Sequence, residues 1–315
     1  MKYYLGIDQG TTGTTSIIFD EEWNIKGKGY LEHTQFYPEP GWVEHDPIEI
    51  WKKTKESVAV ALAQAGINAK DLRAIGLDNQ GETCMAWDKN TGEPVYNAIV
   101  WQDRRTSKQA DKLREGYGKL IKQKTGLSTD AYFSALKIKW ILDNVRGTKE
   151  KAEKGDLLVG TLDTWLLWKM TAEKVYVTDS TTASRTMLFN LQTNQWDDEI
   201  LKIIGIPASL LPVIKTSTEI YGYTDHSFLD AHVPIAGSVL DQAAALFGQA
   251  CFDKGDVKTT YGTGCFMLMN TGEKPVLSRN GLLTTVVWNI DNKITYALDG
   301  GVYIGGAAVQ WLRDG

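Results

Sequence analysis

Short apolar stretches separated by turn residues fill the first thirty positions of the chain. Residues 3–7 and 15–19 are rich in aromatic and β-branched side chains, and the glycine- and threonine-rich segment 8–13 between them is typical of a turn. Another apolar stretch at 25–31 follows a turn near Asn24. This pattern predicts three consecutive strands paired in antiparallel order.

Helix patterns follow. Asp46 and Pro47 favour a helix start, with Asp as the N-cap and Pro at the first helical position, and the next apolar side chains recur with a helical period. Short apolar stretches predict further strands over 74–78 and 233–237. Helical patterns predict further helices over 106–117, 134–143, 161–170, 243–250 and 304–312. The alternation of strands with helices indicates the α/β class.

A second strand–turn–strand unit lies late in the chain, with strands at 257–261 and 265–269 around a Gly-Thr-Gly turn. It suggests a duplicated architecture, although hairpins with such turns are common. A further strand is expected at 296–300, and too few residues remain to complete a second doubly wound lobe. We therefore expect a complete first lobe over 1–250 and the beginning of a second lobe over 251–315.

Composition narrows the classes of function. Hydrophobic residues make up 43% and charged residues 23%, which excludes a disordered chain. A net charge of −5 is a poor match for nucleic acid, and no apolar run is long enough to span a membrane. The N-terminus lacks signal-peptide features, and three cysteines without C-x-x-C spacing are typical of the reducing cytoplasm, which we expect as the location.

The two Gly/Thr turns have a chemical interpretation. Glycine lets the backbone approach an anion, consecutive N–H groups form a nest around phosphate, and Thr11 and Thr12 add hydroxyl donors. Asp8 is placed to hold Mg²⁺ through water. An ordinary hairpin turn explains segment 8–13 equally well, but two facing turns would grip one oligophosphate.

Asp241 and Gln242 stand between a predicted strand and a predicted helix. Asp241 is either a helix N-cap or a general base that takes a proton from a substrate hydroxyl during phosphoryl transfer. Both roles need a carboxylate at this point, so the sequence does not separate them.

Polar and aromatic residues elsewhere suit a polyol. The loop 79–83 combines amides with a carboxylate, which bind vicinal hydroxyls, although a solvated loop is the simpler explanation. Trp101, Tyr132 and Phe266 can wall such a site, although each alone is more often a core residue. The four histidines have no metal-ligand spacing.

Seven segments in a fixed order resemble the FGGY carbohydrate kinases, and among them the glycerol kinases most. These segments include GIDQGTT and PGWVEHDP, and they cover residues 6–12, 40–47, 99–106, 183–190, 241–249, 260–272 and 310–314. The resemblance implies two actin-like, ribonuclease H-like lobes. It also implies phosphorylation of a terminal hydroxyl of a small polyol or sugar, with ATP and Mg²⁺ as cofactors and glycerol as the first candidate substrate.

The resemblance also implies roles for single residues. Asp241 matches the catalytic base of the family, and Asp8 matches its Mg²⁺ site. The residues that match polyol-binding positions are Gly81, Glu82, Trp101, Tyr132, Asp241, Gln242 and Phe266. The residues that match nucleotide-binding positions are Thr11, Thr12, Gly13, Gly262, Thr263, Gly306 and Gln310.

Three departures from the family pattern change the expectation. Glycerol kinases carry Arg where this chain has Gly81, Arg where it has Thr15, and Gly where it has Leu240. Loss of the first Arg removes a hydroxyl donor and vacates volume. Glycerol is then a poor substrate and a longer polyol or ketose is favoured, or a neighbouring Lys or Arg replaces the donor.

Family members are longer, so we expect this chain alone to lack the adenine pocket and to be inactive. Two other hypotheses remain, a nucleotide-operated protein such as actin or an Hsp70-type chaperone, and a substrate-binding lobe without catalytic capacity. Assembly into a homo-oligomer is compatible with the sequence.

Overall fold

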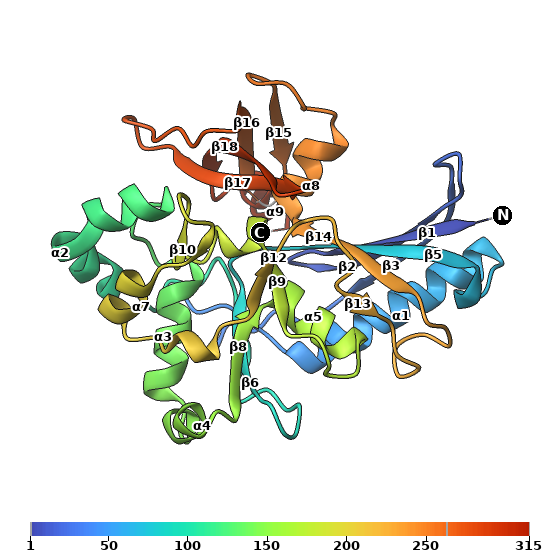
Figure 1. Ribbon diagram of the computed structural model, residues 1–315, viewed down its shortest axis with the longest axis horizontal. Coiled ribbons are helices and arrows are strands. Elements are labelled where there is room, and N and C mark those ends of the chain that lie inside the picture. The colour runs from blue at the N-terminus through green and yellow to red at the C-terminus, as the bar shows by residue number, and fades with distance from the viewer. Residues whose placement is uncertain (1, 263, 315) are drawn as a thin grey trace.

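A six-stranded sheet forms the centre of the computed structural model, which describes residues 2–262 and 264–314 (Figure 1). Its strand order is β13-β14-β5-β1-β2-β3. The strands are β1 (Tyr3–Gln9), β2 (Gly13–Phe19), β3 (Ile25–Glu32), β5 (Leu72–Asn79), β13 (Gly222–Tyr223) and β14 (Pro234–Leu240). The first three strands form the predicted antiparallel meander.

Helix α1 (Pro47–Ala65) covers the β2–β3 side of this sheet, and Asp46 caps it by accepting a hydrogen bond from the Ile48 N–H. The helix lies so close to β3 that a Cβ atom on Gly29 would meet the Ser57 carbonyl oxygen at 2.0 Å. Glycine on this strand is therefore what lets the helix and the sheet pack at short range.

A second sheet and a group of helices complete the larger part of the molecule. The sheet has the order β4-β7-β6-β8, with β4 (Glu44–His45), β7 (Ala98–Ile99), β6 (Cys84–Asp88) and β8 (Leu157–Thr161). The helices are α2 (Ser107–Thr125), α3 (Ser134–Asn144), α4 (Thr148–Lys154), α5 (Leu162–Met170), α6 (Ser180–Ala183) and α7 (Asp198–Ile204).

Short elements connect these layers. Two-stranded ribbons pair β10 (Phe189–Asn190) with β11 (Gln195–Trp196), and β9 (Val177–Asp179) with β12 (Val213–Lys215). Single 3₁₀ turns occupy Ala69–Asp71 and Ala208–Leu210.

A separate four-stranded sheet, drawn in orange and red in Figure 1, lies across the central sheet. Its order is β15-β16-β18-β17, with β15 (Val257–Tyr261), β16 (Cys265–Gly272), β17 (Leu283–Ile290) and β18 (Lys293–Val302). Helices α8 (Asp241–Gly248) and α9 (Gly306–Asp314) flank it in the chain. Strands β15 and β16 form the predicted late hairpin.

Most predicted elements are confirmed, and the differences lie at their ends. The helix predicted over 106–117 continues to Thr125, and the one predicted over 304–312 begins at Gly306. The helix predicted over 243–250 begins at Asp241, because β14 extends to Leu240 and leaves no loop between strand and helix.

Three parallel strands bring distant segments to one edge of the central sheet. Strand β5 pairs in parallel with both β1 and β14, and Asp8, Asp78 and Val239 share one register position. The chain leaves all three strands on the same side, where open α/β sheets bind ligands. The first Gly/Thr turn, the loop 79–83 and Asp241 therefore converge there.

Within the described residues no helix is long and apolar enough to cross a membrane. All three cysteines, Cys84, Cys251 and Cys265, are free thiols.

The packing of α1 on β3 leads to a stability prediction. Gly29→Ala should lower the free energy of unfolding by about 1–3 kcal/mol, because the added methyl group would strike a backbone oxygen that cannot rotate away. Urea denaturation measures the loss. Gly116→Ala in α2 is the control, since its Cβ would meet nothing within 4 Å, and it should gain about 0.5–1 kcal/mol. Equal effects of the two substitutions would contradict the prediction.

Candidate active site

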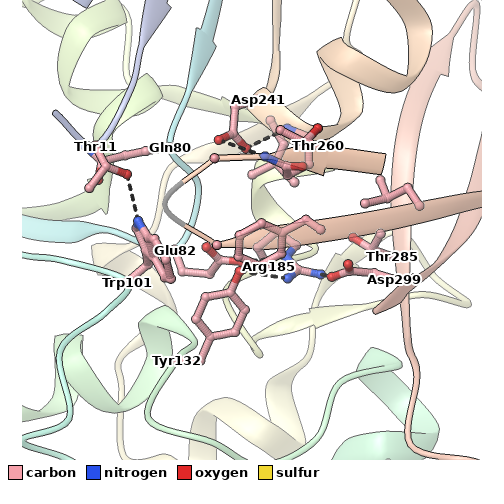
Figure 2. Close-up of a pocket in the computed structure, with 16 residues that line it drawn as sticks. Thr11, Gln80, Glu82, Trp101, Tyr132, Arg185, Asp241, Thr260, Thr285 and Asp299 are labelled. Carbon is pink, nitrogen blue, oxygen red and sulfur yellow. Dashed lines mark hydrogen bonds and ion pairs between the residues drawn. The ribbon is translucent and has the colours of Figure 1, made fainter. Parts of the chain in front are cut away.

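A pocket of about 140 Å³ lies where the central sheet meets the β15–β18 sheet (Figure 2). We call it the central pocket. Its lining includes these residues singled out from the sequence: Thr11, Glu82, Trp101, Tyr132, Asp241, Gln242, Gly262 and Phe266. Asp8, Thr12, Gly13, Gly81 and Gly306 lie outside the described lining. Thr263 and the side chain of Gln310 lie outside the described residues.

Aromatic rings form one wall of the central pocket. The Trp101 ring meets the rings of Tyr132 and Phe266 edge to face, with 5.9 Å between centroids in both pairs. The Trp101 indole N–H donates to Thr11 Oγ1 at 2.9 Å, as Figure 2 shows. The wall is thus fixed to the first Gly/Thr turn, and it offers apolar surface to the carbon chain of a ligand.

The buried side chain of Arg185 contacts the polar groups on another side of the pocket. Arg185 donates from Nε to Glu82 Oε1 at 2.7 Å, and its Nη1 lies 2.9 Å from Asp299 Oδ2. Its Nη2 donates to the Tyr132 hydroxyl at 3.4 Å. All four side chains are almost completely buried. Since buried charges need partners, this contact holds the Glu82 carboxylate in place at the pocket.

Asp241 is the first residue of α8, and Leu240 occupies the N-cap position. The Asp241 carboxylate accepts from the Gln242 N–H at 2.6 Å and faces the pocket. Burial, followed by repulsion from Glu82, raises the pKa of Asp241 to about 7. A carboxyl group with a pKa near neutrality, pointing into a cavity, has the properties of a general base.

A backbone hydrogen bond closes each of the two Gly/Thr turns. The Gly10 N–H donates to the Gly13 carbonyl at 3.0 Å, and the Gly262 N–H donates to the Gly264 carbonyl at 2.9 Å. Gly13 lies in β2, where a Cβ atom would meet the Leu31 carbonyl oxygen at 2.6 Å. Strand packing therefore requires this glycine, independently of any phosphate contact.

Gly306 also serves packing, because its N–H donates to the Gly262 carbonyl at 2.8 Å and its Cβ position faces that same oxygen. The start of α9 is thereby attached to the second Gly/Thr turn.

Asp8 lies beside a second carboxylate that sequence reasoning did not single out. Asp78 is its register partner on β5, and the two carboxyl groups are close enough to share a proton. Burial, together with the charges of Asp8 and Asp241, holds the pKa of Asp78 well above its usual range. Asp78 Oδ1 is buried and has no hydrogen-bond partner among the described residues. Two adjacent carboxylates of this kind fit Mg²⁺, which takes hard oxygen ligands and usually one or two carboxylates.

The expected vacancy at Gly81 does not exist. Gly81 has a φ of +74°, and a Cβ atom there would lie 2.6 Å from Leu240 Cδ1. Leu240 is the register partner of Asn79, so its side chain lies directly under the loop 79–83. The expectation of vacated volume therefore fails at the Cβ position, because Leu240, the third departure from the family pattern, occupies the space next to the first.

Two lining residues, Arg185 and Asp299, were not assigned a role from the sequence. Each lies far along the chain from the motif it contacts, so no local pattern brings it to the pocket. The expectation of a neighbouring cation has two candidates, Arg185 in the lining and Lys258 beside Gln242.

The sequence profile of the FGGY family of carbohydrate kinases, N-terminal domain, matches residues 3–248. The chain therefore belongs to the FGGY family of carbohydrate kinases, and its fold is the actin-like ATPase fold of sugar kinases.

Single relatives agree with this assignment. Glycerol kinase 2 of Thermotoga maritima is 57% identical over 100% of this chain, which spans 64% of that relative's length. The structure of Plasmodium falciparum glycerol kinase with ADP is 40% identical, with a TM-score of 0.92 over 99% of this chain and 63% of that one. Gluconate kinase from Lactobacillus acidophilus shares the fold alone, at 22% identity, with a TM-score of 0.87 over 99% of this chain and 62% of that one.

The raised pKa of Asp241 predicts how stability depends on pH. Between an ordinary value near 3.8 and about 7, the folded chain binds a proton at this site that the unfolded chain does not. Stability is therefore lost as pH rises through this range. Asp241→Asn should unfold a few degrees higher than wild type at pH 8, and the difference should vanish near pH 4.

Thermal unfolding at both pH values measures this effect. Asp230→Asn is the control, because that side chain is 99% exposed and carries no desolvation cost. A destabilised Asp241→Asn variant at pH 8 would show that the carboxylate is held by stabilising contacts instead.

Proposed function

We propose that this chain carries the substrate site and the catalytic base of an ATP-dependent kinase that phosphorylates a terminal hydroxyl of a small polyol, with glycerol as the first candidate. The observation that carries the proposal is the Asp241 carboxyl group, which has a pKa raised to about 7 and lies in a small pocket beside Glu82 and Gln242. The glycerol kinases among its relatives support the choice of substrate. Because the chain spans less than two thirds of their length, activity belongs to a protein of their full length.

Each side of the central pocket has a part in this reaction. Asp241 accepts the proton of the attacking hydroxyl, while Glu82 and Gln242 hold the other hydroxyls of the polyol. Trp101 and Phe266 cover its carbon chain. A polyol of three carbons is of the right size for a cavity of about 140 Å³.

The two Gly/Thr turns flank the pocket and would hold the phosphate groups of ATP, through backbone N–H groups and the hydroxyl of Thr11. Asp8 and Asp78 would hold Mg²⁺ between the phosphates and the central sheet. Mg²⁺ bound there supplies positive charge that offsets the negative charge of the transferred group. Free cysteines agree with a location in the cytoplasm.

Leu240 favours glycerol over a longer polyol or ketose. The volume that a longer substrate would need beside Gly81 is occupied by this side chain. Arg185, which touches both Glu82 and Tyr132, is the cation that takes over as donor near the substrate. These two residues make the three-carbon substrate the better fit.

Asp241→Asn should separate binding from chemistry. In a protein of the relatives' full length, the variant should lose about 10²–10⁴-fold in kcat while glycerol affinity changes far less. In the wild type, kcat/KM should rise with pH through about 7, because the base acts in its ionised form. A coupled assay of ADP release and calorimetry with glycerol provide the two measurements.

The same experiment on the 315-residue chain tests the hypothesis of a substrate-binding lobe. Glycerol should bind, and the rate of ADP release should stay at background. Near wild-type turnover by Asp241→Asn at full length would reduce Asp241 to a structural role. Turnover typical of a kinase by the short chain would contradict its expected inactivity.

The contact between Gly81 and Leu240 predicts that the two positions must change together. Gly81→Arg alone should lower the melting temperature without improving glycerol affinity, because the new side chain meets Leu240. Gly81→Arg combined with Leu240→Gly should bind glycerol about tenfold more tightly, which is the gain expected from one charge-assisted hydrogen bond.

Calorimetry and thermal unfolding of the two single variants and the double variant give the answer. Leu240→Gly alone is the control for the cavity that it opens. Tighter glycerol binding by Gly81→Arg alone, at unchanged stability, would show that Leu240 does not block this position.

A further inference from the structure

Lys258 has an unusual place for a lysine. On β15 the usual burial of apolar side chains and exposure of charged ones is reversed. Lys258 is only 5% exposed, while the apolar Val257 before it is 47% exposed. Lysine is almost never buried unless it has a partner. Its burial therefore calls for a specific explanation.

The contacts of Lys258 connect strand β15 with helix α8 beside the central pocket. Its Nζ donates to Gln242 Oε1 at 2.5 Å and to Thr260 Oγ1 at 2.7 Å. Gln242 belongs to α8, and Thr260 lies near the end of β15, just before the second Gly/Thr turn. Among the described ion pairs none includes Lys258, so both acceptors are neutral oxygens of pocket-lining residues.

This contact fixes which way the Gln242 amide faces. An ammonium group has donors only, so the amide oxygen must face Lys258. The amide nitrogen then faces the other way, 3.4 Å from Asp241 Oδ2. A ligand hydroxyl beside Gln242 and Asp241 therefore meets an N–H donor next to a carboxylate acceptor. Without Lys258 the amide is free to rotate by half a turn and to present its oxygen beside that carboxylate.

We propose that Lys258 is a positioning residue for polyol recognition, which orients the Gln242 amide so that its N–H group faces the substrate and the Asp241 carboxylate. The proposal rests on the proposed polyol site. It also gives the buried charge a role, because Lys258 connects that site with the turn that would carry phosphate. The nearby charges of Asp241 and Asp299 oppose the effect of burial, which lowers the pKa of Lys258.

Calorimetric titration of the chain with glycerol tests this role. Lys258→Met, which keeps the length of the side chain and removes its donor, should weaken glycerol binding about tenfold, the size of one lost hydrogen bond. Lys258→Arg retains a donor and should stay within about threefold of wild type. Lys254→Met is the matched control, because Lys254 is exposed nearby and should bind glycerol as wild type does.

A double-mutant cycle separates positioning from general structural support. If Lys258 acts through the amide, Lys258→Met should cost no further affinity in a Gln242→Leu background. Additive losses in the two variants, or wild-type affinity in Lys258→Met, would overturn the inference and leave the proposed function standing. Absence of glycerol binding by the wild type would overturn the proposed function, and the inference with it. Should Lys258→Met fail to fold, Lys258→Leu, which also lacks a donor, replaces it in the same cycle, and positioning again predicts no further loss in the Gln242→Leu background.

Discussion

The parallel pairing of β1, β5 and β14 is the constraint on which the site depends. Because parallel neighbours end at the same edge of a sheet, this register places Asp8, Asp78 and Asp241 close together, although up to 233 positions separate them along the chain. The arrangement concentrates negative charge at the point where a negatively charged phosphate donor would arrive. The pKa values of all three carboxyl groups are raised, first because the groups are buried and, for Asp78 and Asp241, also because neighbouring carboxylates repel their negative charge.

Two buried cations oppose this charge from the other sheet and from the segment after α6. Arg185 forms ion pairs with Glu82 and Asp299, whereas Lys258 donates, among the described residues, to the neutral oxygens of Gln242 and Thr260. A paired cation fixes the carboxylates that it touches, and an unpaired one leaves the Asp241 carboxyl free to exchange a proton. The Asp241 carboxyl group, with a pKa raised to about 7, therefore lies close to a Glu82 side chain that Arg185 holds in place.

Much of the fold was predictable from the sequence, because meander, hairpin and helix starts are set by local patterns such as Asp46-Pro47. The aromatic residues of the central pocket and Asp241 were singled out from residue types and from the family resemblance, and the structure brings them together in its lining. Arg185 and Lys258 were not assigned roles, because their contacts depend on tertiary packing. In the structure β15 alternates regularly between exposed and less exposed positions, and Lys258 occupies the buried one while Val257 is exposed.

The loop after β5 shows why departures from a family pattern must be interpreted in pairs. Taken singly, Gly81 implies a lost donor and an open space, and Leu240 implies crowding beside the base. In the structure the two residues are neighbours. The Leu240 side chain occupies the position that a Cβ atom of residue 81 would take, so it requires a residue without a side chain there. The positive φ of Gly81 favours glycine for a second, independent reason. The apolar side chain of Leu240 therefore lines the pocket next to the loop 79–83, while Glu82, Arg185 and Gln242 supply polar side chains to the same lining.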